Sequence, residues 1–195
     1  TSQVSLRGPG HWLFKRSMSG GGILAWLGCH WIDLLSFLMD SRIVAVSAMI
    51  ATRCGEAIDV EDTASIIMRF DNGCIGALRA GYALKPFHGY DPSDLTITME
   101  GSLGAISWVP ERREGYRLRT GHPRFSGISR RTVQVSYDVP KGAMGYAPEL
   151  MEAFLDAIEH GREPPATAQH ALHVLRVLEA AYRSADEHRE VEVAP

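Results

Sequence analysis

The pattern of hydrophobic and polar positions changes twice along this chain of 195 residues. Residues 19–40 carry apolar residues at helical spacing, which predicts a long helix opening at Ser19–Gly22 and ending near Asp40. On an ideal wheel of about 100° per residue, one broad face is rich in leucine and is predicted to face the core: Leu24, Leu27, Trp31, Leu34, Leu35 and Leu38. Another face carries Trp26, Cys29, His30, Asp33 and Phe37.

From Arg42 onward the apolar residues alternate with polar ones, as is typical of strands. Asp71-Asn72-Gly73 is a hairpin signal between two of these segments. Short turns and no helices separate the segments, so we expect a largely antiparallel sheet. The predicted strands cover 44–50, 63–70, 75–84, 95–99, 105–109, 116–120 and 133–137.

Two helices close the chain. Pro148 suits the first position of a helix that runs to about His160, with Gly161 as its stop. Thr167 is predicted to cap a second helix, and a short strand is expected near residues 191–193. This order predicts an α+β fold, a mainly antiparallel open β-sheet with helices packed on one face. We expect one domain over 1–195, in which 1–16 is a remnant of an interdomain segment.

Composition narrows the function classes. Hydrophobic residues make up 45% of the chain, enough for a core, and the net charge of -3 with 22% charged residues favours neither disorder nor polyanion binding. The three cysteines form no CxxC pair and no zinc-type spacing, which predicts reduced thiols, no metal site and a cytoplasmic protein. No signal-peptide pattern and no apolar run near ~20 residues is evident, so we expect no membrane association.

The strongest candidate chemistry lies on the first predicted helix. Trp26 and His30 are four residues apart and His30 and Asp33 are three apart, so they share a face away from the leucines. A histidine beside a carboxylate suits general acid–base catalysis. The alternative is a His–Asp pair on a solvated helix face, and periodicity does not decide between the two.

Four segments together resemble one enzyme family. The Ser-Gly-Gly-Gly loop with the helix to Leu35 is similar to the signature helix of the glucose–fructose oxidoreductase / inositol dehydrogenase (Gfo/Idh/MocA) family. Val60–Ala64 with Arg69–Gly73 resembles that family's first hairpin. Met151–Pro165 and Ala180–Ala185 resemble its closing segments. In this order they span roughly residues 12–193.

The resemblance implies a two-domain oxidoreductase. Such enzymes bind NAD or NADP on an N-terminal Rossmann domain and a sugar, inositol or related polyol against the C-terminal sheet domain. His30 matches the histidine that exchanges the substrate hydroxyl proton during hydride transfer. The family's catalytic lysine lies in a Glu-Lys-Pro motif, which this chain lacks, as it lacks a strand–GxGxxG–helix pattern. Because it also begins at Thr1, we expect a C-terminal fragment that is inactive alone, with homodimers or homotetramers forming through the open sheet face.

Further substrate and cofactor contacts are expected around that helix. Trp26 stands where many members have a substrate-binding aspartate; its ring cannot accept a proton but can stack against the C–H face of a sugar. Lys15 is a candidate for a substrate anion or the cofactor ribose, with an ordinary surface charge as the alternative. Tyr82 is either a pocket aromatic or a sheet-packing residue. Gly20, Gly21 and Gly22 would let the nicotinamide end of the cofactor approach closely.

Two other functions are alternatives for this sequence. A run of arginines could mark a nucleic-acid patch, but its strand-like spacing and the lack of interleaved stacking aromatics favour a solvated hairpin and no nucleic-acid partner. These arginines are at positions 112, 113, 117, 119, 124, 130 and 131. The second alternative is a non-catalytic sheet domain that mediates homo-oligomerisation.

Overall fold

The structure, a computed structural model, describes residues 4, 7–81, 95–109, 115–125, 130–133 and 147–195. The chain divides into two compact units, Thr1–Asp91 with Asp156–Pro195, and Pro92–Leu155. Each unit is described by itself. The sequence predicted a single domain over 1–195, and this remains a prediction.

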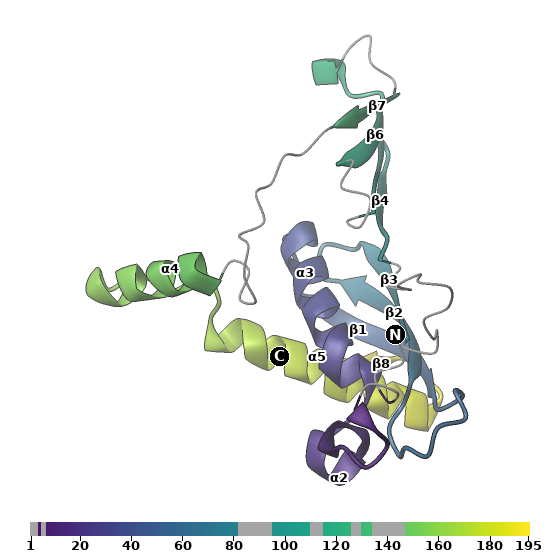
Figure 1. The fold of residues 1–195 in the computed structure, drawn as a ribbon. Coiled ribbons are helices and arrows are strands. Elements are labelled where there is room, and N and C mark those ends of the chain that lie inside the picture. Colours follow the sequence, from purple (N-terminus) through teal and green to yellow (C-terminus); the bar gives the residue numbers. More distant parts are fainter. Residues whose placement is uncertain (1–3, 5–6, 82–94, 110–114, 126–129, 134–146) are drawn as a thin grey trace. The chain divides into compact units, whose positions relative to one another are not determined.

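The first unit contains a four-stranded sheet in the order β3-β2-β1-β8 (Figure 1). Its strands are β1 (Ile43–Ala51), β2 (Thr63–Phe70), β3 (Ile75–Gly81) and β8 (Val191–Glu192), and all neighbours pair antiparallel. Gly73, with φ of 84°, turns the chain between β2 and β3, where the Phe70 N–H donates to the Cys74 carbonyl at 2.9 Å. The predicted hairpin and the short final strand are therefore confirmed.

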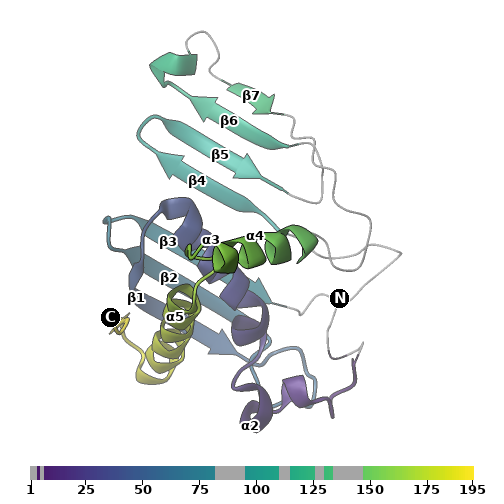
Figure 2. The same cartoon turned by 90° about the vertical axis from the view of Figure 1, so that its left-hand side faces the viewer.

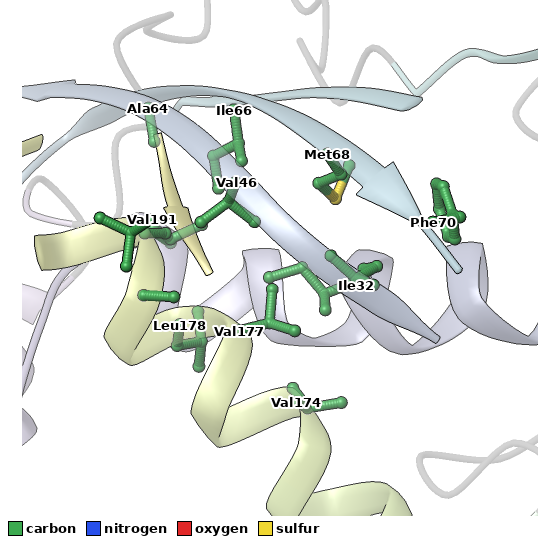
Figure 3. Close-up of a cluster of buried hydrophobic side chains, with 14 residues drawn as sticks. Ile32, Val46, Ala64, Ile66, Met68, Phe70, Val174, Val177, Leu178 and Val191 are labelled. Carbon is green, nitrogen blue, oxygen red and sulfur yellow. The ribbon is translucent and has the colours of Figure 1, made fainter. Parts of the chain in front are cut away.

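Helices cover one face of this sheet. The helix carrying His30 begins at Ile23, contains a π-helical turn at Leu24–Gly28 and continues as α3 (Cys29–Met39). It lies beside α5 (Ala168–Glu187) on the same side of β1 and β2 (Figure 1). In β2 the residues facing these helices, at even positions from Ala64 to Phe70, are buried, while the alternate ones are exposed or half-buried. Ile32, Val46, Met68 and Val177 meet in the resulting core (Figure 3).

The predicted core face of the first helix is partly wrong. Leu24 is buried as expected, but the next buried hydrophobic side chain is that of Ile32, and Leu27 is 37% exposed. Cys29, assigned to the opposite face, packs against the core. The cause is the π-turn, which holds one extra residue and rotates everything after it by roughly 100° relative to a regular α-helix. Ile32 is thereby aligned with Leu24.

Buried polar groups join α5 to the sheet. The ring Nε2 of His173 accepts from the Ile43 N–H at 3.2 Å, and the Ser184 hydroxyl accepts from the Ala48 N–H at 2.9 Å. Burial lowers the pKa of His173, with help from the nearby Arg42, so the ring is neutral and its Nε2 can accept. These two hydrogen bonds fix the position of α5 along the strand direction of β1.

The second unit contains another four-stranded antiparallel sheet, in the order β4-β5-β6-β7 (Figure 2). Its strands are β4 (Ile97–Gly101), β5 (Gly104–Trp108), β6 (Tyr116–Thr120) and β7 (Arg130–Val133). The described pairings thus form two sheets, whereas the sequence predicted one. In β6 the exposed Arg117 and Arg119 alternate with the half-buried Tyr116 and Leu118, as expected for a strand with one solvated face.

The two closing helices occur where they were predicted. The sequence boundary between the units falls within α4 (Ala147–Glu159). The helix α5 begins after Thr167, whose hydroxyl accepts from the His170 N–H at 3.2 Å. The predicted Thr167 cap is confirmed. The predicted strands 75–84 and 133–137 run partly into residues outside the described ones.

One expectation about apolar segments was wrong. The stretch Arg16–Met39, 24 residues, has the length and composition of a membrane span. The core helix of a folded domain meets the same criterion, and this stretch places Leu24 and Ile32 in the core at 0% exposure. Packing against the sheet therefore explains part of its apolar character, since 28% of the apolar window is buried.

Candidate functional site

The glycine loop before the His30 helix is shaped by contacts inside the first unit. Gly20 ends α2 (Arg16–Ser19) with φ of 76°, a conformation that favours glycine. A Cβ atom at Gly21 would overlap the Tyr182 hydroxyl, and one at Gly22 would overlap the Glu61 carbonyl oxygen. Gly21 and Gly22 are both buried, so Tyr182 and Glu61 require glycine there regardless of any cofactor.

A buried carboxylate lies at the start of this helix. Glu61 is 2% exposed, and its two oxygens accept from the Gly22 N–H at 2.9 Å and the Leu24 N–H at 3.1 Å. The Tyr182 hydroxyl donates to the same carboxylate at 2.8 Å. Burial, and then the charge of Glu61, raise the pKa of Tyr182 well above its usual range, so the phenol keeps its proton and remains a donor.

The candidate residues on the helix share an accessible face. His30 and Asp33 are exposed and Trp26 is half-buried. Among the residues that the structure describes, no hydrogen bond or ion pair between His30 and Asp33 is recorded. His30 and Asp33, three residues apart in α3, are thus both accessible on one side of that helix, and the half-buried Trp26 precedes them in the π-turn.

Trp26 has a cationic neighbour that the sequence did not predict. The guanidinium carbon of Arg7 lies 4.9 Å from the centre of the Trp26 ring, within the range of a cation–π contact. The Arg7 guanidinium thus covers one face of the Trp26 indole. A second contact of this kind places Arg16 5.8 Å from the Tyr182 ring.

The structure describes some of the remaining candidate residues. Lys15 is exposed directly before α2, where its carbonyl accepts from the Ser19 N–H at 3.0 Å. Tyr82 lies outside the described residues. Burial raises the pKa of the Cys29 thiol, so it is protonated at neutral pH and is not a nucleophile. Within the described ranges, no group of three or more His, Cys, Asp or Glu side chains is placed to hold a metal ion.

Sequence reasoning missed Glu61, Tyr182 and Arg7. Glu61 and Tyr182 both stand in segments that carry the family resemblance, yet they were given no role. A signal was present, because two adjacent acids, Glu61 and Asp62, immediately precede a strand with a buried face. When two such carboxylates are buried, each needs hydrogen-bond donors beside it. Asp62, at 0% exposure, finds them in the backbone N–H groups of Arg53 and Cys54.

Comparison with known proteins agrees with this fold. The model of an oxidoreductase family's C-terminal alpha/beta domain, that of Gfo/Idh/MocA, matches residues 5–193. Inositol 2-dehydrogenase of Rhizobium meliloti is 28% identical over 183 residues, covering 92% of this chain and 51% of that protein. Levoglucosan dehydrogenase of Pseudarthrobacter phenanthrenivorans is 26% identical over 187 residues, covering 78% of this chain and 47% of that protein.

A solved structure extends the comparison. Levoglucosan dehydrogenase in complex with NADH and levoglucosan superposes with a TM-score of 0.75 at 25% identity, covering 96% of this chain and 55% of that one. The chain thus spans about half the length of the relatives that it matches. It belongs to the Gfo/Idh/MocA oxidoreductase family, of which it contains the C-terminal alpha/beta domain.

Proposed function

We propose that this chain is the substrate-binding half of a nicotinamide-dependent oxidoreductase acting on a sugar, a polyol or a related carbinol. The observation that carries the proposal is the exposed His30 ring on a helix face that it shares with Trp26 and Asp33. Family membership supports it, since the relatives are dehydrogenases of inositol and levoglucosan. The site residues are proposed from their position on this face.

In this proposal His30 is the general acid–base. Its ring takes the proton of the substrate hydroxyl during oxidation and returns it during reduction. The bound nicotinamide cofactor supplies hydride transfer. Asp33 is a substrate contact; it would orient His30 only if binding brings the two side chains together, as catalytic hydrogen bonds often tighten on binding.

Trp26 forms a wall of the substrate site in this proposal. With Arg7 over one face of the ring, the rest of the indole is left for the C–H face of a sugar. Lys15, exposed beside the glycine loop, is proposed as a contact for an anionic group of the substrate. The substrate is therefore expected to combine an apolar ring face with hydroxyl groups.

We expect the cofactor, NAD or NADP, to contact this chain at one exposed position of the glycine loop. Nothing lies within 4 Å of a Cβ atom built at Gly20, and this glycine is exposed, whereas Gly21 and Gly22 are buried. Gly20 is thus the position of the loop that would face the nicotinamide end. The diphosphate and the adenosine ribose need the Gly-rich turn and acidic residue of a Rossmann domain, which we place in a preceding domain.

The full-length protein tests this proposal. We expect it to reduce NAD or NADP with at least one member of a panel of inositols, anhydrosugars and aldoses, and we expect residues 1–195 alone to bind neither cofactor tightly. Nucleotide fluorescence measures the turnover, and calorimetric titration measures the binding. A dissociation constant in the low micromolar range for folded residues 1–195 would overturn the division of labour between the domains. No turnover with any of the panel would count against the substrate class.

We further propose that the uncovered sheet face of the first unit joins copies of this chain. Met49, Ile67 and Ile75 on that face are 82%, 58% and 75% exposed. The register places Ile67 between Ser47 and Ala77, so each of the three strands contributes an exposed apolar side chain to this face, with serine and arginine side chains between them. This is more apolar surface than a solvated face favours, and the family resemblance implies the same homodimer or homotetramer.

Charged substitutions on this face are expected to separate the copies. Met49→Lys with Ile67→Lys should shift the full-length protein to smaller species, because each lysine would be buried without a partner. Light scattering at ~50 μM measures the change. Leu103→Lys, which changes an apolar residue 54% exposed in a turn of the second unit, is the control. A strictly monomeric wild-type protein at this concentration would rule the interface out.

A further inference from the structure

One residue, Glu61, satisfies the first backbone donors of the His30 helix. Its carboxylate accepts from the N–H groups of Gly22 and Leu24, and its own carbonyl accepts from the Ile23 N–H at 3.0 Å. Three consecutive N–H groups at a helix start, which have no partner within the helix, are thus bound by a residue from the loop between β1 and β2.

The chemistry of this contact requires a carboxylate. The N–H groups of Gly22 and Leu24 and the Tyr182 hydroxyl all donate to the carboxylate. An ionised carboxylate has only acceptor sites, and its charge is stabilised at the positive end of the helix dipole. An amide of the same shape would point its NH₂ group at one of these donors. The network therefore distinguishes glutamate from glutamine.

The bound segment leads directly into the π-turn. Leu24, whose N–H is held by Glu61, is the first residue of the turn Leu24–Gly28. Past the turn, the helix is anchored by Ile32 in the core. If the residues before Leu24 were released, the turn could wind up into a regular α-helix, and the segment before the turn would rotate by roughly 100° relative to the part anchored by Ile32. Glu61 thus holds the π-turn in the register in which Leu24 and Ile32 both face the core, and with it the position of Trp26 relative to His30.

We propose that Glu61 is a positioning residue for the reaction: its carboxylate, held by Tyr182, locks the glycine loop and the π-turn so that His30 and Trp26 face the same substrate. This inference rests on the function proposed above. It assigns no proton transfer to Glu61, which is buried beneath the loop. It predicts an effect on catalysis that exceeds any loss of folded protein.

The test compares three variants of the full-length protein below its unfolding temperature. Glu61→Gln is expected to lower kcat by roughly 10–100-fold, since a displacement of about 1 Å in a catalytic group can cost 10²-fold. Tyr182→Phe removes one donor and leaves the N–H bonds, so kcat should fall several-fold. Glu187→Gln, in an exposed ion pair with Arg183 at 3.5 Å, is the matched control and should match wild type.

Two readouts separate positioning from stability. Titration with reduced cofactor counts the folded sites and normalises kcat, and its dissociation constant should change less than about twofold because the cofactor is held by the other domain. Amide exchange of residues 22–28 should be faster in Glu61→Gln than in the control. These two results together are expected from a displaced helix start.

The activities of these variants decide whether Glu61 has the positioning role. If Glu61→Gln is folded and its normalised kcat lies within threefold of wild type, the positioning role is wrong. If Glu61→Gln does not fold, Tyr182→Phe decides: an unchanged kcat overturns the proposal, and a several-fold loss with unchanged cofactor binding supports it. His30→Ala keeps the two proposals distinct, because an inactive His30→Ala beside a fully active Glu61→Gln would refute the positioning role alone.

Discussion

Replacing His30 with alanine in the full-length protein is expected to lower kcat by roughly 10²–10⁴-fold, the usual contribution of a positioned general acid–base group. The thermal midpoint should barely move. The side chain is exposed, and among the described residues the ring makes no recorded hydrogen bond or ion pair, so no packing is lost. Steady-state turnover on the substrate found in the panel, together with thermal unfolding, measures both.

His170→Ala is the matched control for this experiment. His170 is exposed at the start of α5, where its backbone N–H donates to the Thr167 hydroxyl. Its replacement should leave kcat unchanged. If His30→Ala keeps activity within a few-fold of wild type, His30 is not the acid–base group and the catalytic face must be sought elsewhere.

Gly22→Ala is expected to destabilise the protein by ~3 kcal/mol or more, at or above the upper end of what overpacking usually costs. The added Cβ would overlap the carbonyl oxygen of Glu61 and lie 2.9 Å from its backbone nitrogen and carbonyl carbon. These are backbone atoms, so no side-chain rotation relieves the overlap. Either the loop between β1 and β2 or the helix start must move, and the bonds from Gly22 and Leu24 to Glu61 weaken with it.

Gly10→Ala provides the comparison, because a Cβ at Gly10 meets nothing within 4 Å and the residue needs no left-handed conformation. Denaturant unfolding of both variants measures the difference. A Gly22→Ala protein as stable as Gly10→Ala would mean that the close approach of the loop to the helix is not required for folding.

Most elements of the fold followed from local patterns. β2 was predicted because Ala64, Ile66 and Met68 alternate with polar or exposed residues, and each of these three is buried. The hairpin at residues 71–73 and the Thr167 cap were predicted because turn and cap chemistry is contained in a few consecutive residues. Predictions of this kind succeed where the interactions are short in sequence.

The helix that carries the site shows where local patterns fail. An ideal wheel placed Leu27 in the core and Cys29 outside it, and the structure reverses both. The sequence of residues 23–39 gives no sign of the π-turn. Its first residue, Leu24, is bonded to Glu61, which lies 37 residues away in sequence. His30 and Asp33 are exposed and Trp26 is half-buried, so none of the three lies in the core.

The sequence by itself therefore determined the α+β order of elements, the helices on one face of a sheet and the family, because these depend on periodicity, turn residues and contiguous motifs. Only the tertiary structure decided how the site is built. The contacts of Glu61 with Gly22, of Tyr182 with Glu61 and of Arg7 with Trp26 each join residues far apart in the chain. Hydrogen bonds and stacking of this kind act over a few ångströms in space, so they have no period in sequence.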